Sequence, residues 1–259
     1  MDLDHVAIAV HDVHPAMRTL IGEFGGTVRE GGTSVGFRVM QVTLGRHGMN
    51  VELLEPWAVE SNDFLERFLA RYGEGPHHFT FKVPDLATEL ERIRATGYRP
   101  VQIDLSSPFW KEAFLPPDQA HGTVIQVAES GLDNPDVARL LEGRDNPWQR
   151  QWWEDPPPRG PNPVTLRRVV ISSPALREAT DLFGGLLGGT AAEQGEGWME
   201  LQWPGGGRIR IEERDDRGPG IDRLECEHEG IAAERIVGGA RFVLGNPTTA
   251  NRRARPGPG

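Results

Sequence analysis

The chain has 259 residues, enough for two domains, and its 37% hydrophobic and 25% charged residues are typical of a globular protein. The net charge of −10 leaves no basic excess to neutralise phosphates, which argues against nucleic-acid and anionic-membrane partners. The single cysteine, Cys226, excludes an intrachain disulfide and a cysteine-rich zinc site, and we expect it to be a small buried apolar residue.

The first residues, MDLDHVAIAVHDVHP, are charged from the second position and have no basic segment before an apolar run, so no signal peptide is predicted. The sequence also lacks a run of about 18 apolar residues, which a membrane-spanning helix needs. We therefore expect a cytoplasmic protein.

Residues 3–10, LDHVAIAV, alternate in polarity and predict a half-buried strand. His5 shares one face of this strand with two alanines, opposite a face of larger apolar residues. A helix is predicted at about 13–24, where Gly25 and Gly26 end it. The elements expected next are strands near 34–43 and 49–55 and a helix at about 61–72.

A second series begins with GEGPHHFTFKV, residues 73–83. Strict strand alternation puts His78 on the face opposite the phenylalanines and leaves His77 in the other phase, outside any site that includes His78. A helix is then expected at about 85–97 and a strand at 122–129.

The two series form an internal repeat. The shift along the chain that places His5 on His78 also places Asp12 on Asp85. Glu52 follows His5 at nearly the same interval at which Gln126 follows His78, and each lies in the last strand of its series. Each series therefore reads β-α-β-β-β, with one polar residue on its first strand and another on its last.

LDHVAIAVHDV and GPHHFTFKVPDL resemble the module openings of the vicinal oxygen chelate superfamily, which includes glyoxalase I, extradiol dioxygenases and bleomycin-resistance proteins, and above all those of methylmalonyl-CoA epimerases. The resemblance implies an α+β fold in which tandem βαβββ modules form cup-shaped mixed sheets. It also implies a divalent metal ion bound by one residue from each of four strands, here His5, Glu52, His78 and Gln126.

Two imidazoles, a carboxylate and an amide oxygen suit Fe, Co, Ni, Mn or Zn. Relatives often have a carboxylate where Gln126 stands, and this amide is expected either to bind the metal or to hydrogen-bond the substrate or a water. An amide cannot accept a proton, so Glu52 is the expected catalytic base. The sequence offers no obvious second proton acceptor.

Four residues are candidates for substrate contacts. Arg38 lies on a predicted strand, while Trp110, Lys111 and His121 lie in residues 106–122, where relatives often place a loop over the substrate. Anchoring of that loop by aromatic burial and solvated charges is the alternative interpretation for the last three.

Residues 131–164 predict an interdomain connection with a short helix at about 134–143. Its tryptophan-rich stretch, 147–153, is expected to pack against the domain, with a lid as the alternative. The tail at 246–259 is expected to be disordered.

Residues 165–245 resemble a degenerate, shortened copy of the same domain, after the complete two-module domain at 1–130. The positions of three metal ligands are taken by arginines, which repel cations, so we expect no metal there. We expect Arg168, Arg210 and Arg223 to pair with the nearby Glu200, Glu212 and Glu225 in a structural or dimer role. Binding of an anion is the alternative.

The resemblance implies a metal-dependent isomerase, epimerase or lyase that acts through an enolate-like intermediate on a small carbonyl substrate with chelating oxygens. An Fe(II) dioxygenase is the first alternative, because two histidines and one carboxylate also compose its metal site. The second is a binding protein without catalysis, of the kind that sequesters antibiotics. A small molecule is the expected partner, and a homodimer is possible.

Overall fold

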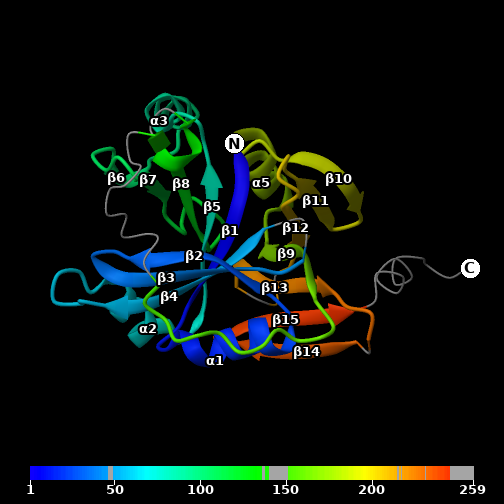
Figure 1. Ribbon diagram of the computed structural model, residues 1–259. Coiled ribbons are helices and arrows are strands. Elements are labelled where there is room, and N and C mark those ends of the chain that lie inside the picture. The colour runs from blue at the N-terminus through cyan, green and yellow to red at the C-terminus, as the bar shows by residue number, and fades with distance from the viewer. Residues whose placement is uncertain are drawn as a thin grey trace, which may run out of the picture.

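The computed structural model describes residues 1–45, 49–135, 138–139, 151–214, 216, 218–230 and 232–245. These residues form two mixed β-sheets, one of eight and one of seven strands, with few helices (Figure 1). The expected α+β fold is therefore confirmed.

The first sheet is built from residues 2–130. Its strands are β1 (Asp2–Ala9), β2 (Thr27–Thr33), β3 (Gly36–Thr43), β4 (Asn50–Trp57), β5 (Gly75–Lys82), β6 (Val101–Asp104), β7 (Trp110–Leu115) and β8 (Val124–Ser130). They lie in the order β2-β3-β4-β1-β5-β8-β7-β6. The helices of this half are α1 (Val13–Met17), which continues as the π-helical segment η1 (Arg18–Glu23), α2 (Phe64–Tyr72), α3 (Leu86–Ala95) and the short η2 (Gly131–Asp133).

The connectivity is that of two βαβββ modules. Within each module the first and last strands pair in parallel, β1 with β4 and β5 with β8. The antiparallel pair β1 and β5 joins the modules, so the two strands that carry the repeated histidines lie side by side. The first helix ends where expected, at Gly25, whose φ of 65° is the left-handed conformation of a helix stop.

One element differs from its prediction. The covering loop expected at 106–122 contains strand β7, which pairs with β8 from Trp110 opposite Ser130 to Leu115 opposite Ile125. The segment is a strand because Ala113 and Leu115 point into the core while the alternate residues Glu112 and Phe114 face the other way.

The second sheet is built from residues 165–245. Its strands are β9 (Thr165–Ser173), β10 (Thr190–Gly195), β11 (Trp198–Gln202), β12 (Arg208–Glu213), β13 (Gly220–Glu227), β14 (Ala233–Val237) and β15 (Ala240–Gly245). They lie in the order β10-β11-β12-β9-β13-β15-β14. The helical segments are α5 (Leu176–Thr180) and η4 (Asp181–Leu186).

The second sheet repeats the order of the first with one strand fewer. Residues 165–213 form a complete βαβββ module. Only residues 228–232 separate β13 from β14, whereas residues 83–100 separate β5 from β6 and hold α3. The last module is shortened, as expected, because these few residues have no room for a helix.

The two sheets share one hydrophobic core. Phe183 of η4 packs against Phe79 and Phe81 of β5, with ring centroids 6.1 and 6.4 Å apart. In the opposite direction Phe24, at the end of η1, packs against Phe242 of β15 at 5.6 Å. Each half thus packs the end of its first helical segment against the other half, η4 against β5 and Phe24 after η1 against β15. Cys226 is buried in this core, as expected.

Residues 151–164 run along the first half. The indole nitrogen of Trp152 donates to the Val39 carbonyl at 2.9 Å, and the guanidinium of Arg159 donates to the Gly25 carbonyl at 2.8 Å. The tryptophan-rich stretch therefore packs against the domain, as favoured, over its described residues 151–153. The rest of that stretch, most of the helix expected at 134–143 and the tail lie outside the described residues.

No helix among the described residues is both long and apolar enough to cross a membrane.

Candidate metal centre

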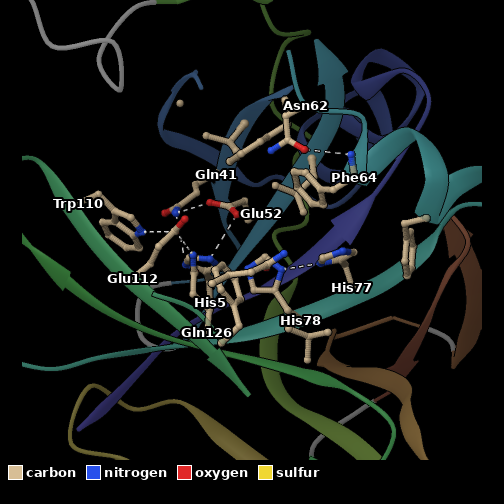
Figure 2. A pocket seen from close by; sticks show the side chains of 18 of the residues that line it. His5, Gln41, Glu52, Asn62, Phe64, His77, His78, Trp110, Glu112 and Gln126 are labelled. Atoms are coloured by element: carbon tan, nitrogen blue, oxygen red, sulfur yellow. Dashed lines mark hydrogen bonds and ion pairs between the residues drawn. The ribbon is translucent and has the colours of Figure 1, made fainter. Parts of the chain in front are cut away.

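Three neighbouring strands bring the candidate ligands together. Ala7 of β1 lies opposite Glu52 of β4 on one side and opposite His78 of β5 on the other. His5 is two residues before Ala7 and shares its face, so the three polar side chains converge on one point (Figure 2). One ligand atom from each of His5, Glu52 and His78 lies within 4.8 Å of the others, and all three residues are buried.

The ring nitrogens at this point lack partners. Nε2 of His5 and Nε2 of His78 are buried without a hydrogen bond, and the former lies 3.3 Å from Oε1 of Glu52. Buried polar atoms are nearly always satisfied, so two unpaired nitrogens beside a carboxylate indicate a missing partner. A divalent cation fits, because it accepts lone pairs from imidazole and carboxylate together.

The two histidines differ in charge. Burial disfavours a charge on His5, but the carboxylates of Glu52 and Asp4 outweigh burial and raise the pKa of His5 to about 9. Burial keeps the pKa of His78 well below its usual range, and the positive His5 lowers it further. At neutral pH the metal-free His5 is therefore positively charged, and a cation bound by this ring would have to displace its second proton.

His77 lies in the site, contrary to the prediction from strand alternation. It lines the same cavity as His78, and the Nδ1 atoms of the two rings are 2.8 Å apart. Strict alternation fails here because the pairing between β1 and β5 passes from His78 to Pro76 and skips His77, which makes a β-bulge. Burial lowers the pKa of His77 to about 4, so the ring is neutral at pH 7.

Gln126 reaches the cavity from β8, and both ends of its amide are engaged. Its Oε1 accepts from the Thr80 hydroxyl at 2.5 Å, and its Nε2 donates to Oε2 of Glu112 at 2.7 Å. Metal ligation by Gln126 therefore remains a prediction. On the other side of the site, Gln41 donates to Oε2 of Glu52 at 2.9 Å and holds that carboxylate in place.

Glu112 is a functional candidate that was not predicted from the sequence. Strand β7 turns Trp110, Glu112 and Phe114 into the cavity, and the Trp110 indole donates to Oε2 of Glu112 at 3.1 Å. Burial raises the pKa of Glu112. The signal was present in WKEAFL, residues 110–115, whose alternate residues form one polar-aromatic face and one apolar face, but the stretch falls within the segment expected to be a loop.

The cavity above these residues has a volume of about 1030 Å³. Phe64 and Phe68 of α2 line it near the end of β1, and Arg29 and Lys82 line it near the start of β1. Aromatic rings thus line one side of the histidines, and charged side chains of both signs also line the cavity, with Lys82 paired to Asp133 at 3.1 Å.

Of the predicted substrate contacts, only Trp110 lines the cavity. Arg38 lies on the opposite face of β3, between Glu55 and the ring of Trp152, because alternation aims Val39 and Gln41 into the cavity instead. The remaining two are engaged elsewhere: Lys111 pairs with Glu129 at 2.6 Å, and His121 contacts Ser173 of the second half at 3.0 Å.

The equivalent place in the second sheet is filled by ion pairs. Arg168 bonds to Glu200 and Glu225, each at 2.6 Å, and Arg210 bonds to Glu200 at 2.9 Å. Arg223 pairs with Glu212 at 2.6 Å and with Glu225 at 2.8 Å. The expected pairing of these arginines is confirmed, and their guanidiniums are held by carboxylates rather than presented to an anion.

The histidine-bearing half resembles known proteins. Residues 4–114 match the family model described as Glyoxalase/Bleomycin resistance protein/Dioxygenase superfamily. The mitochondrial methylmalonyl-CoA epimerase of Dictyostelium discoideum is 27% identical over 130 residues, which are 49% of this chain and 77% of that protein.

Solved structures are similar over different lengths. The methylmalonyl-CoA epimerase of Mycobacterium tuberculosis is 25% identical, with a TM-score of 0.46 over 53% of this chain and 91% of that one. A hypothetical protein from Staphylococcus aureus is 13% identical, with a TM-score of 0.61 over 95% of this chain and 99% of that one, so the fold of both halves together has a precedent. The part of the chain that carries His5, Glu52 and His78 is thus similar to the glyoxalase/bleomycin resistance/dioxygenase superfamily.

Proposed function

We propose that the first half is a divalent-metal-dependent epimerase or isomerase that moves a proton at the carbon beside a carbonyl group. The observation that carries this proposal is the pair of unpaired Nε2 atoms, from His5 and His78, which meet the Glu52 carboxylate in a large cavity. These three residues would hold the metal, with Gln126 as the predicted fourth ligand.

A divalent cation held there would supply a Lewis acid that draws electron density from the carbonyl oxygen and so acidifies the neighbouring carbon. The residues of the chain have separate tasks. Gln41 orients Glu52, and the aromatic walls from α2 and β7 exclude water from the reacting carbon.

Two of the carboxyl groups that line the cavity lie on opposite sides of the histidines. Glu52 comes from β4 and Glu112 from β7, and strands β1, β5 and β8 lie between them in the sheet. Inversion of a carbon centre needs a proton acceptor on one face and a donor on the other. We assign these roles to Glu52 and Glu112, and the burial that raises the pKa of Glu112 suits a group that must hold and return a proton.

The similarity to an epimerase of Dictyostelium discoideum supports epimerisation over a lyase reaction. Methylmalonyl-CoA is therefore the first substrate to test. The cytoplasmic location and a homodimer remain predictions.

The test combines metal analysis with proton exchange. The purified chain is loaded separately with Fe(II), Co, Ni, Mn and Zn, and uptake of deuterium from D₂O at carbon 2 of methylmalonyl-CoA is followed by mass spectrometry. We expect one equivalent of metal and deuterium uptake by the wild type. Glu112→Gln should keep the metal and lose about 10²- to 10⁴-fold in rate, while Glu66→Gln, on the exposed side of α2, serves as the control.

A chain that binds none of these metals would contradict the metal-dependent mechanism. Unchanged exchange in Glu112→Gln would contradict the role of that carboxyl group.

One observation favours a second candidate function. The amide of Gln126 is engaged by Thr80 and Glu112, which leaves two histidines and one carboxylate, the composition of an Fe(II) oxygenase site. Oxygen consumption with catechol-type substrates in the Fe(II)-loaded protein would favour this alternative. Deuterium uptake without oxygen consumption would favour the epimerase.

A further inference from the structure

The residue that precedes each candidate ligand histidine contacts that histidine's Nδ1 atom. Oδ2 of Asp4 is 2.7 Å from Nδ1 of His5, and Nδ1 of His77 is 2.8 Å from Nδ1 of His78 (Figure 2 shows the second pair). The two contacts occupy equivalent places in the repeat, because the shift that places His5 on His78 also places Asp4 on His77.

Two β-bulges make these contacts possible. In a regular strand, consecutive side chains point to opposite faces and could not meet on one side. The ladder between β1 and β5 passes from Leu3 to His5 and from His78 to Pro76, so Asp4 and His77 are the residues left without a partner. A bulge re-aims the extra side chain, and here both extra side chains reach the histidine that follows.

The second sheet keeps the same irregularity. The ladder between β9 and β13 passes from Ile221 to Arg223 and skips Asp222, which occupies the position of His77. Asp222 bonds to the guanidinium of Arg223, the next residue, at 2.7 Å. The bulge of β5 is therefore repeated in β13, and in both strands the skipped residue contacts the residue that follows it.

The two contacts determine which ring nitrogen faces the cavity as an acceptor. The Asp4 carboxylate can only accept, so Nδ1 of His5 carries the hydrogen. Asp4 is itself held near Lys82 at 3.5 Å and Arg29 at 3.8 Å. In neutral His5 the lone pair then lies on Nε2, toward Glu52.

The contact between the His77 and His78 rings likewise indicates which nitrogen of His78 carries the hydrogen. If His77 donated to His78, the hydrogen of His78 would lie on its buried Nε2, which has no partner among the described residues. If His78 donates from Nδ1, its one hydrogen has an acceptor and Nε2 presents its lone pair. His77 is then the acceptor, and its ring packs against the Phe68 ring with centroids 4.6 Å apart.

We propose that Asp4 and His77 are a matched pair of positioning residues, which hold the Nδ1 hydrogens of His5 and His78 so that both Nε2 atoms face one metal ion. The proposal rests on the proposed metal-dependent function and adds how the donor atoms are selected. Hydrogen-bond partners of this kind typically change metal affinity about 10- to 100-fold.

The first test measures tautomers in the metal-free protein. Nitrogen-15 chemical shifts of the histidine rings should report His78 as the Nδ1–H tautomer in the wild type. In His77→Phe, which keeps the aromatic packing but removes the acceptor, His78 should become a mixture of tautomers. Unchanged His78 shifts in this variant would overturn the proposal, whether or not the protein is an enzyme.

The second test measures Co²⁺ affinity by calorimetry and by the cobalt absorption spectrum. His77→Phe should weaken binding about 10- to 100-fold, and His77→Asn, whose Oδ1 can replace the Nδ1 acceptor, should recover part of the loss. Asp4→Leu should weaken binding more than Asp4→Asn, which keeps an acceptor oxygen. His11→Phe, at an exposed histidine two residues after the end of β1, is the control.

Wild-type Co²⁺ affinity in both His77→Phe and Asp4→Leu would overturn the positioning roles. Complete loss of Co²⁺ in His77→Phe together with binding retained in His78→Ala would also overturn them, because His77 would then be the ligand. If the wild type itself bound no metal, the proposed function would fail, while the tautomer measurement would still decide this inference.

Discussion

The buried histidines of the site respond to pH in opposite directions. His77 and His78 resist protonation because burial lowers their pKa, whereas the carboxylates around His5 raise its pKa to about 9. A metal-free site therefore carries its positive charge on the one histidine that two carboxylates surround. Because His77 and His78 stay neutral, the charged His5 has no second positive imidazole beside it.

Acid should destabilise the metal-free protein through His77. Its pKa falls from 6.5 to about 4 on folding, so between these values the unfolded chain binds a proton that the folded chain does not. The contribution of neutral His77 to the free energy of unfolding is fully present above pH 6.5 and is lost as the pH falls through about 4. The loss amounts to about 3 kcal/mol. In the metal-free protein, urea unfolding across this range should show a smaller pH dependence for His77→Phe than for the wild type.

The control for this experiment is His11→Phe, in which the free energy of unfolding should depend on pH as it does in the wild type. His5 acts in the opposite sense, since its contribution is present below pH 6.5 and is lost as the pH rises through about 9. Equal acid slopes for His77→Phe and the wild type would contradict the assignment of a buried, neutral His77.

At the scale of elements, α2 covers one end of the curved sheet. Leu65 and Leu69 pack against small and apolar residues of β1, β3 and β4 in a separate cluster on the cavity side. Phe64 and Phe68 of the same helix form the aromatic wall of the cavity. The helix lies between the two modules, so it closes the cavity without contributing a candidate ligand.

Leu69→Ala should loosen α2 and leave the metal centre intact. Removing a buried leucine side chain typically costs about 2–5 kcal/mol, and here the lost contacts are those that hold the helix to the sheet. Hydrogen exchange of the α2 amides should increase, while Co²⁺ affinity should stay within about twofold, because the ligands lie on strands.

Leu90→Ala is the matched control, because Leu90 of α3 is equally buried but packs on the far side of the sheet. It should lower overall stability without selective exchange in α2. Identical exchange patterns in the two variants would show that α2 is not held by this cluster.

At the scale of the whole molecule, the two halves differ in chemistry but depend on each other for packing. The second half fills the equivalent place with ion pairs around the fully buried Glu200, so the proposed metal centre lies in the first half. Both halves contribute to one core, in which Phe183 lies against the strand that carries His78.

Phe183→Ala should therefore destabilise both halves together, by about 3–5 kcal/mol. The loss of its ring removes contacts with Phe79 and Phe81 on β5 as well as packing in its own half. Hydrogen exchange under mildly denaturing conditions should show equal loss of protection in β5 and β9. Loss confined to residues 165–245 would contradict a single cooperative core.

Much of the site could be predicted because its information is local. Alternation along β1 and the internal repeat placed His5, Glu52 and His78 on one face, where the structure brings them together. The second-half arginines were equally predictable, since equivalent positions followed from the same repeat.

The predictions were wrong where the pairing between strands determines which way a side chain points. A bulge depends on how two strands register, so the sequence of β5 alone could not show that His77 turns toward His78. Arg38 was misplaced for a related reason, since only the register of β3 with β4 decided which of its faces lines the cavity.

The sequence by itself determined the modules, the three convergent residues and the charge-filled second half, because strand periodicity and an internal repeat are properties of the chain. Only the tertiary structure decided that Glu112 enters the cavity, that Asp4 and His77 contact the histidines and that both halves share one core. Those features arise from contacts between strands distant in sequence, whose register and bulges are set by the packing of the whole sheet.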